Sequence, residues 1–412
     1  MPQERNANRA AVQPPGPPPG NGLTRRRVLG ALAGSGLLAG CGGALPPAPD
    51  SASGTPPIRL RWLGETRVPH RLDAAGTTVG GLSALDYDPL ADRWFALSDD
   101  RSDLQSARFY TLSLSIGLQG PQAPRDWTPV PLRQPDGSLF PSRRSASAPG
   151  TPVVDPEAMR WRPGAGTLLW ASEGDRRLGL APSIHECAPD GRPLRRFAMP
   201  SHFRSDGPPA QGVRDNLGLE GLALTPDGQG LWAAMEAPLL QDGPVPAVGQ
   251  PGGPCRFTLF DVQRGEPVQQ RAYRPDPVPV APQPASAFAD NGVSEILMLD
   301  AWRMLVLERA FITGFGNSLR LYLVDTRSGS DTLHQDSLSP GNHEPMPKTL
   351  VLDFAQAGIP RLDNTEGMTW GPRLANGRRS LVLVSDDNFN PGQITQFLAF
   401  ECIEPTPETS LS

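Results

Sequence analysis

Carboxylates recur at regular places along this 412-residue chain, and their setting is repeated five times. Each copy has an acidic or hydroxyl residue near the start of an apolar stretch, then a turn, then a second apolar stretch that ends at a carboxylate. The five starting residues are Ser83, Glu157, Glu220, Glu295 and Glu366. The five closing residues are Asp99, Glu173, Glu236, Glu308 and Asp386. Oxygen donors of this kind are the ligands that Ca²⁺ and other hard cations take, so the pattern predicts carboxylate chemistry around a bound cation.

The spacing of the copies predicts the fold that must position them. Starting residues lie 63 to 75 positions apart, and the interval from start to close is 16 residues in the first three copies, then 13 and 20. Repeats of this length, made of short apolar strands around turns, are typical of β-propeller blades. In the third copy the sequence Thr225–Gly228 (Thr-Pro-Asp-Gly) is a tight-turn sequence between two apolar runs. We therefore predict an all-β fold, a single propeller of five four-stranded blades, with room for a sixth in the irregular regions 116–150 or 238–290.

A further strand-like stretch follows each pair of apolar runs, and we expect these stretches to be the outer strands. They are 108–115, 183–187, 256–261, 319–325 and 394–402. The segment Ile58–Leu63 precedes the first copy and has no partner within it. We expect this segment to pair with the C-terminal stretch and to close the ring, which removes the free sheet edges.

Equivalent positions of the innermost strands should lie at one height around the propeller axis. We expect Glu157, Glu220, Glu295 and Glu366 to form a ring there, with Ser83 in the fifth place. Carboxylates that face one another repel unless a cation compensates, so one interpretation is a Ca²⁺ site made by these residues with Asp99 and Asp387. The other interpretation is architectural, with each carboxylate accepting backbone N–H groups from the neighbouring blade.

The closing residues form a second set, in which acids mostly stand beside arginines. We predict that Arg101, Arg176, Glu308, Arg309 and Asp386 are the catalytic candidates. Acids that hold a metal and guanidinium groups that bind phosphate oxygens would suit phosphoester cleavage, where positioning and charge stabilisation dominate. Salt bridges between blades are the alternative interpretation. Neither set contains an evident nucleophile, and none of the five histidines lies inside a repeat, so water on a metal is the expected nucleophile.

The N-terminal region is predicted to direct export. Residues 24–29 (Thr-Arg-Arg-Arg-Val-Leu) resemble a twin-arginine signal, and the apolar run that follows is too short to span a bilayer. Residues 38–41 (Leu-Ala-Gly-Cys) have the pattern of a bacterial lipobox, so we expect residues 1–40 to be a signal peptide and Cys41 to carry the lipid. An ordinary cleavable signal with an incidental Cys41 is the alternative.

These segments define the expected organisation of the chain. Residues 41–57 are expected to be a tether, 58–404 the propeller and 405–412 a disordered tail. Gly42 gives no acidic inner-membrane retention signal, so we expect a periplasmic protein anchored in the outer membrane. Three cysteines then remain in an oxidising compartment, and we expect one disulfide and one buried thiol among Cys187, Cys255 and Cys402. The net charge of -5 gives no basic surface for nucleic acid, and we expect a monomer.

Nine short motifs, taken in order, resemble the bacterial phytase-like family described as "esterase-like activity of phytase". They are residues 81–88, 95–100, 107–110, 155–159, 172–174, 218–223, 307–309, 364–368 and 385–389. The resemblance spans about residues 58–404, and it departs from the family pattern at Ala158, where glycine is expected. It implies a secreted β-propeller that hydrolyses phosphate or other esters. Calcium-dependent propeller phytases are a related idea, but their metal ligands cannot be carried over residue by residue.

Three functional hypotheses follow. The first is an exported, metal-assisted hydrolase that acts on a small anionic ester, such as a phosphomonoester. The second is a lactonase that resembles the gluconolactonase-like propellers, which would use Asn364, Asn388 and Asp386 beside an axial glutamate. The third is a non-catalytic, lipid-tethered propeller that binds an envelope partner or glycan through its loops, including region 238–290.

Overall fold

The computed structural model describes residues 58–206 and 210–404. The predicted signal peptide, Cys41, the tether and the tail lie outside the described residues. Within the described ranges, no helix has the length and apolar character needed to cross a bilayer.

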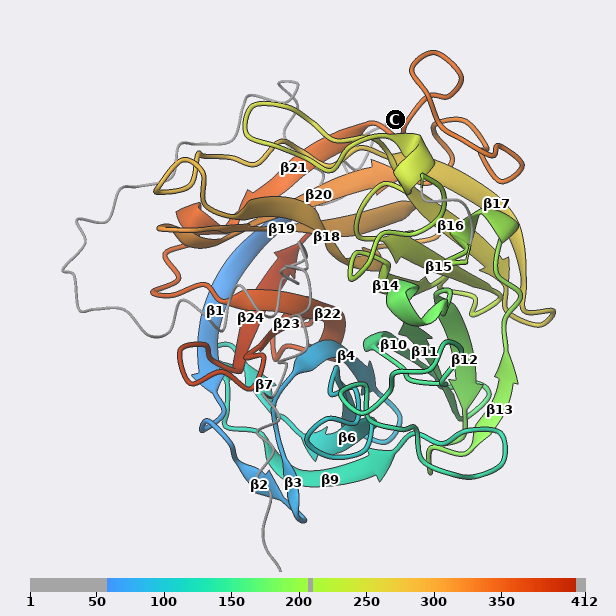
Figure 1. The fold of residues 1–412 in the computed structure, drawn as a ribbon. Helices are drawn as coiled ribbons and strands as arrows, with labels where there is room; N and C mark the ends of the chain where they lie inside the picture. The colour runs from blue at the N-terminus through green and yellow to red at the C-terminus, as the bar shows by residue number, and fades with distance from the viewer. Residues whose placement is uncertain (1–57, 207–209, 405–412) are drawn as a thin grey trace, which may run out of the picture. The chain divides into compact units, whose positions relative to one another are not determined.

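Five antiparallel sheets of four strands make the blades of a β-propeller (Figure 1). Blade 1 contains β4 (Leu82–Asp88), β5 (Arg93–Ser98), β6 (Arg108–Ser113) and β9 (Arg125–Pro131). Blade 2 contains β10 (Pro156–Arg162), β11 (Thr167–Ser172), β12 (Ser183–Cys187) and β13 (Pro193–Arg196). Blade 3 contains β14 (Leu219–Leu224), β15 (Gly230–Met235), β16 (Cys255–Asp261) and β17 (Glu266–Tyr273).

The last two blades complete the ring. Blade 4 contains β18 (Ala289–Met298), β19 (Arg303–Ile312), β20 (Gly316–Asp325) and β21 (Lys348–Asp353). Blade 5 contains β22 (Asn364–Arg373), β23 (Arg379–Asp386), β24 (Gln396–Ile403) and β1 (Arg59–Arg67). Two small hairpins, β2 (Asp73–Ala74) with β3 (Thr77–Thr78) and β7 (Ile116–Gly117) with β8 (Gly120–Pro121), lie outside the blades.

The predicted closure of the ring is confirmed. Strand β1 pairs antiparallel with β24, from Arg59 opposite Ile403 to Arg67 opposite Gln396. The innermost strands β4, β10, β14, β18 and β22 contact one another in turn and surround the centre in Figure 1. Five blades are therefore present, and the described residues of regions 116–150 and 238–290 form no further four-stranded sheet.

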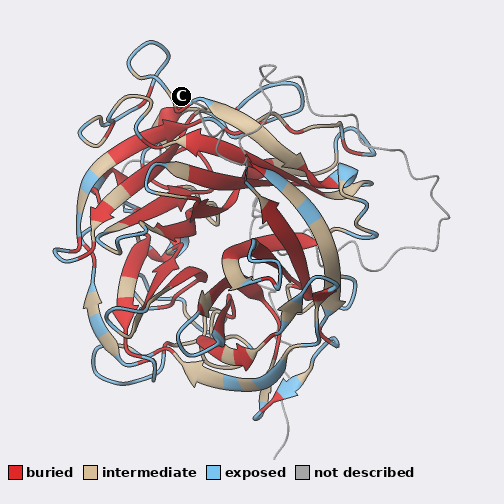
Figure 2. Cartoon of the chain, turned by 180° about the vertical axis from the view of Figure 1, so that it is seen from behind, coloured by how far each residue is buried: buried red, intermediate tan, exposed pale blue. Residues whose placement is uncertain are grey.

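The stretches predicted as outer strands are in fact the third strand of each blade. The fourth strands are β9, β13, β17, β21 and β1, and only β1 was predicted as a strand. These edges alternate between exposed and half-buried residues, as β17 does over Glu266–Gln269. Figure 2 shows the same contrast, with buried residues concentrated on the inner strands. An edge strand buries too few side chains to leave an apolar run in the sequence, which is why these strands escaped prediction.

The expected disulfide is wrong. Cys187, Cys255 and Cys402 are all free and buried, and they lie on β12, β16 and β24 of three different blades. Burial raises the pKa of the Cys187 thiol to about 12 and that of Cys402 to about 11. The three side chains are therefore protonated, apolar parts of the packing.

Candidate active site

Each innermost strand carries one extra residue, close to its start in four blades and in the middle of β18 in blade 4. The register between first and second strands shifts there in every blade, which marks a β-bulge. The bulged residues, called here the bulge ring, are Ser83, Glu157, Glu220, Ser294 and Glu366. The pattern repeated in the sequence thus corresponds to a β-bulge in every blade, which changes the direction of one side chain per blade.

The expected place of Glu295 in this ring is wrong. Ser294 is the bulged residue, and Glu295 lies one position further along, opposite Leu307. The prediction aligned the acidic residues of the copies with one another and so placed the fourth copy one residue too late. A serine hydroxyl occupies the bulge in this blade, where other blades have a carboxylate. Both serines use this position to join blades: Ser83 Oγ donates to the Pro156 carbonyl at 3.0 Å, and Ser294 Oγ donates to the Thr365 carbonyl at 3.3 Å.

The same shift affects the residues that close the second strands. Arg309 lies opposite Gly292, whereas Glu308 lies opposite Val293. The equivalent positions, called here the closing ring, are Asp99, Glu173, Glu236, Arg309 and Asp386. Four acids and one arginine therefore stand above the bulge ring, and all five are buried.

Residues of these two rings, together with Asp155 directly before β10, form two groups of three carboxylates. Among the described residues, Asp155, Glu157 and Glu173 form one group, and Glu173, Glu220 and Glu236 form the other. Within each group, one oxygen from each residue lies within 4.8 Å of the others. We call these five residues the axial cluster. Glu173 belongs to both groups, so the cluster is continuous across blades 2 and 3.

The hydrogen bonds of the axial cluster are incomplete. Glu173 Oε1 accepts from the Gly218 N–H at 2.6 Å, but its Oε2 is buried without a hydrogen-bond partner. Glu220 Oε2 is in the same condition, and this side chain is only 5% exposed. A buried carboxylate oxygen without a partner is costly, so each is a place where a cation or a proton is needed.

The pKa values of these carboxyls follow from their burial. Burial first, and then Asp155 and Glu236, raise the pKa of Glu173 to about 8, against the lowering effect of the Gly218 N–H and Arg101. Burial, together with Glu236, Glu173 and Glu366, raises the pKa of Glu220 well above its usual value. Across the axis, burial and then Asp99 raise the pKa of Asp386 well above its usual value.

Arg309 is the cation built into the closing ring. Its Nη2 lies 3.0 Å from Glu366 Oε1 and 3.8 Å from Glu236 Oε1, and the side chain is 1% exposed. Its Nε and Nη1 are buried without hydrogen-bond partners. Asn364 Nδ2 donates to Glu366 at 2.9 Å and to Asp386 at 3.1 Å. Glu366 is thus paired with a cation from blade 4, and both Glu366 and Asp386 accept a hydrogen bond from Asn364 of blade 5.

Further arginines lie at the rim on blades 1 and 2. Arg101 contacts Asp155 at 3.1 Å and Asp175 at 2.7 Å, and Arg143 also pairs with Asp175. The side chains of Arg101 and Arg143 are 14% and 23% exposed, so both reach the solvent side of the cluster. Arg176 is used differently, because it donates to the carbonyls of Gln211 and Val213 and so ties two loops together.

Glu295 belongs to a pin that closes the axis at the next level. Arg160 Nη2 lies 2.8 Å from Glu295 Oε2, and its guanidinium donates to the carbonyls of Leu85, Met159, Ile296 and Met368. Glu295 Oε1 accepts from the Leu222 N–H at 3.1 Å. This pair joins the innermost strands of all five blades, so Glu295 has an architectural role.

Glu308 faces a separate polar cluster. It accepts from Tyr273 Oη at 2.6 Å, from Asn291 Nδ2 at 2.9 Å and from the Asp276 N–H at 3.0 Å, and Lys348 Nζ lies 2.5 Å away. All of its acceptor capacity is used inside the protein. Its predicted catalytic role therefore finds no support in the geometry.

At the rim between blades 1 and 5, the predicted ligand Asp387 lies beside His70 and Phe389, which were not predicted as site residues. Asp387 Oδ1 accepts from the N–H groups of Gly81 and Phe389, both at 3.0 Å, and His70 Nδ1 lies 3.5 Å from Asp387 Oδ2. Phe389 has a φ of 52°, a strained conformation for a bulky residue. A Cβ on Gly81 would lie 2.2 Å from Asp99 Oδ1 and 2.6 Å from Phe389 Cε2. The aromatic ring of Phe389 and the carboxylate of Asp99 therefore leave no space for a side chain at position 81.

Most of the predicted site residues are brought together, but not in the predicted roles. Glu157 and Glu220 belong to the axial cluster, whereas Asp99, Glu366 and Asp387 lie outside the two three-carboxylate groups found among the described residues. The residues missed as ligands are Asp155, Glu173 and Glu236. Asp155 could have been found from its place two residues before Glu157, because strand starts and strand ends meet at this level.

Comparisons with known proteins give one strong match. No curated protein matches the chain. Among solved structures, hydrazine synthase of Kuenenia stuttgartiensis is 13% identical over 76% of this chain and 80% of its own, with a TM-score of 0.36. The catalytic domain of the GH62 alpha-L-arabinofuranosidase of Coprinopsis cinerea is 9% identical over 84% of this chain and 98% of its own, with a TM-score of 0.43. Likenesses this weak carry no argument about function.

The family comparison covers the propeller and its axial residues. Residues 77–389 match the phytase-like family, described as esterase-like activity of phytase. The matched range includes both rings and the Arg160–Glu295 pin. The chain therefore belongs to the phytase-like family.

Proposed function

We propose that this protein is an exported hydrolase that cleaves a phosphomonoester or another small anionic ester at the axial cluster, assisted by a hard cation such as Ca²⁺. The observation that carries the proposal is the shared position of Glu173 in two carboxylate groups, with Glu173 Oε2 and Glu220 Oε2 buried and unpartnered. Membership of the phytase-like family supports the hydrolytic class.

The donors of the axial cluster fit a hard cation. Every ligand candidate is a carboxylate, with neither histidine nor cysteine in either group, which suits Ca²⁺, Mg²⁺ or Mn²⁺ rather than softer metals. Asp155, Glu157, Glu173, Glu220 and Glu236 would hold the ion. A bound cation would neutralise these carboxylates and polarise an ester or phosphoryl oxygen.

The remaining polar residues support the same activity. Arg101 and Arg143 are partly exposed at the rim, where guanidinium groups attract and orient an anionic substrate. Arg309 adds a buried positive charge on the opposite side of the axis from Arg101, with two nitrogens available. Because Arg160 and Glu295 close the axis below, we infer that the substrate approaches from the rim.

A lactonase is the second candidate, and one observation favours it. Asn364 bridges Glu366 and Asp386, and Asn388 Nδ2 is buried beside them without a hydrogen-bond partner. Amide and carboxyl groups on one side of the axis could bind a lactone carbonyl and ring oxygen. This activity would use blade 5, whereas the phosphatase would use blades 2 and 3.

The test is a substrate panel with and without metal. The purified full chain is assayed on p-nitrophenyl phosphate, phytate, p-nitrophenyl acetate and a γ-lactone, in EDTA and after addition of Ca²⁺. We expect phosphate release that EDTA abolishes and Ca²⁺ restores, and a loss of at least 100-fold in Glu220→Gln. Glu266→Gln, a change at an exposed residue, is the matched control.

Three outcomes would contradict the proposal. Phosphatase activity that survives both EDTA and Glu220→Gln would exclude the axial cluster as the metal site. Turnover of the lactone alone would select the second candidate. Bound calcium without turnover of any substrate would favour the non-catalytic propeller that binds an envelope partner.

A further inference from the structure

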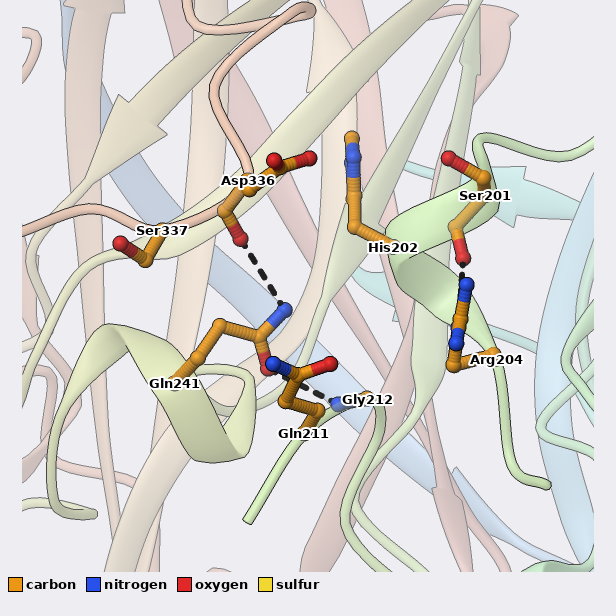
Figure 3. A pocket seen from close by; sticks show the side chains of 8 residues that line it. All are labelled: Ser201, His202, Arg204, Gln211, Gly212, Gln241, Asp336 and Ser337. Atoms are coloured by element: carbon orange, nitrogen blue, oxygen red, sulfur yellow. Dashed lines mark hydrogen bonds between the residues drawn. The ribbon is translucent and has the colours of Figure 1, made fainter. Parts of the chain in front are cut away.

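A polar cavity of about 260 Å³ opens beside blade 3, and none of its lining residues belongs to the axial cluster (Figure 3). It lies between the loop that precedes β14, the short helix η4 (Leu240–Asp242) and the long loop between β20 and β21. Its lining consists of Ser201, His202, Arg204, Gln211, Gly212, Gln241, Asp336 and Ser337. Residues from the connection between blades 2 and 3 and from one loop each of blades 3 and 4 therefore converge on one opening.

The floor of the cavity is held by a buried ion pair. Arg256, fully buried, binds Asp242 through Nε at 2.6 Å and through Nη2 at 2.9 Å. Arg256 Nη1 donates to the Gln335 carbonyl at 2.8 Å, and Asp242 Oδ1 accepts from the Leu338 N–H at 2.8 Å. The loop that carries Asp336 and Ser337 is thereby fixed to blade 3 on both sides of the cavity.

The wall opposite this loop is fixed as well. Gln241 Oε1 accepts from the Gly212 N–H at 2.8 Å, and Gln241 Nε2 donates to the Asp336 carbonyl at 3.3 Å (Figure 3). A Cβ on Gly212 would lie 2.0 Å from the Arg204 carbonyl oxygen, so the turn requires glycine. The cavity is thus preformed, and a ligand would need little ordering of the protein to bind.

His202 offers a neutral donor to this cavity. Its Nε2 lies 3.1 Å from Gln270 Nε2 and 3.5 Å from Arg256 Nη1, both donors, so Nε2 accepts and Nδ1 carries the hydrogen. Burial and the nearby Arg256 lower the pKa of His202 to about 3. The imidazole therefore stays uncharged at physiological pH and cannot act as an anion-binding cation.

The lining suits a neutral ligand with many hydroxyl groups. Two serine hydroxyls and the amide of Gln211 can donate or accept, the imidazole of His202 has only its Nδ1–H left as a donor, and no apolar side chain lines the cavity. The charges of Arg204 and Asp336 oppose each other, which gives no net attraction for phosphate. The volume is below the range of about 300–1,000 Å³ that is typical of drug-sized ligands, so the occupant is one small unit.

We propose that this cavity binds a single sugar or cyclic polyol unit, at a site separate from the axial cluster. The exposed side chains of Ser201, Gln211, Asp336 and Ser337 supply donors and acceptors around a backbone that Gln241 holds, as recognition of neighbouring hydroxyl groups requires. Arg176 donates to the Gln211 carbonyl at 3.1 Å, so one wall of the cavity is tied to the blade 2 loop that carries Glu173 and Asp175. A glycan held here would therefore contact a loop connected to the candidate active site.

The test is ligand-observed NMR with isothermal titration on the full chain. The probes are D-glucose, N-acetylglucosamine and myo-inositol, with inorganic phosphate as the anionic comparison. We expect saturable binding of at least one neutral probe and a loss of at least tenfold in affinity in both Gln211→Ala and Asp336→Ala. Gln263→Ala, on the β16–β17 turn, is the control, and Glu220→Gln should leave sugar binding unchanged.

The proposal fails if no neutral probe binds at 50 mM, if phosphate alone binds, or if both cavity variants bind the sugar as wild type does. Thermal unfolding of each variant shows whether it is folded. If Asp336→Ala unfolds, Ser337→Leu replaces it, because this change fills the cavity from an exposed loop and leaves the buried ion pair intact. Because Glu220→Gln separates the two sites, failure of hydrolysis and failure of sugar binding are distinguishable.

Discussion

Replacing Glu173 by glutamine should stabilise the metal-free protein at alkaline pH. In the wild type the pKa of Glu173 is raised from 4.5 to about 8. A carboxyl with a raised pKa stabilises the folded state fully below its unfolded pKa, and this stability is lost as the pH rises through the folded pKa. From pH 4.5 to pH 9 the free energy of unfolding should therefore fall by about 5 kcal/mol through this group alone.

Glutamine at position 173 keeps an oxygen that can accept a hydrogen bond and removes the negative charge of the carboxylate. Its oxygen can still accept from the Gly218 N–H, and its amide places donors where Oε2 now has no partner, toward Asp155 and Glu236. The variant should match the wild type near pH 5 and exceed it by as much as about 5 kcal/mol at pH 9 in EDTA. With about 2.1 cal/mol/K of unfolding entropy per residue over about 350 residues, this corresponds to a rise in Tm of about 7 °C.

The assay is thermal unfolding of the full chain from pH 5 to pH 9, in EDTA and in saturating Ca²⁺. In Ca²⁺ the order should reverse, because a ligand that binds only the folded state stabilises the wild type more than a variant that lacks one carboxylate. Asp242→Asn is the control: it leaves the Arg256 charge buried and should cost about 3–5 kcal/mol at every pH. A difference in Tm that does not change with pH in EDTA would refute the reasoning.

Three more predictions test the electrostatics of the axis. Binding of Ca²⁺ at pH 7 should release up to about one proton from Glu173, whose pKa of about 8 leaves it largely protonated without a cation, and the raised pKa of Glu220 acts in the same direction. Titration calorimetry in two buffers of different ionisation enthalpy measures this release, and a heat independent of buffer would contradict it. Arg309→Met should lower the free energy of unfolding at pH 7 by about 3–5 kcal/mol. The same variant should bind Ca²⁺ more tightly, because it removes the positive charge beside Glu366 and Glu236. Equal or weaker Ca²⁺ affinity would argue against Arg309 and the cation acting on the same carboxylates. Arg160→Met should lower the free energy of unfolding, measured in urea, by at least about 4 kcal/mol. Adding Glu295→Gln to this variant should recover part of the loss. If the effects of the two single changes simply add, Arg160 and Glu295 do not act as a unit.

The fold could be predicted from the sequence wherever apolar runs reach the interior. The first three strands of each blade and the closure by Ile58–Leu63 were visible because their residues pack between blades. The fourth strands were not visible, since residues such as Glu266 and Val268 on β17 alternate between solvent and partial burial. Burial against a neighbouring blade produces an apolar pattern, and an edge strand has a neighbour on one side only.

The position of the site along the propeller axis could be predicted from the sequence, but the residues that form it could not. Acids at the strand starts were expected to meet on the axis, and Glu157 and Glu220 lie in the carboxylate groups found there, but Glu173 and Glu236 from the strand ends join them and were not expected to. The fourth blade misled the alignment, because Ser294 and Arg309 hold the places that acids hold elsewhere. Register, which a single bulge shifts by one residue, decides which side chain faces the axis, and only the paired strands reveal it.

The unequal rings indicate where a positive charge is needed. Buried carboxylates that face one another around the axis could not all ionise, and the chain relieves this with Ser83 on blade 1, Ser294 and Arg309 on blade 4, and Asn364 on blade 5. No such replacement occurs on blades 2 and 3, whose bulge and closing positions are all glutamates, joined there by Asp155. Burial first, and then the neighbouring carboxylates of that arrangement, raise the pKa of Glu173 and Glu220. The densest group of carboxylates therefore lies between blades 2 and 3, where Glu173 Oε2 and Glu220 Oε2 have no hydrogen-bond partner, and a cation bound there would neutralise these two groups without displacing Arg309.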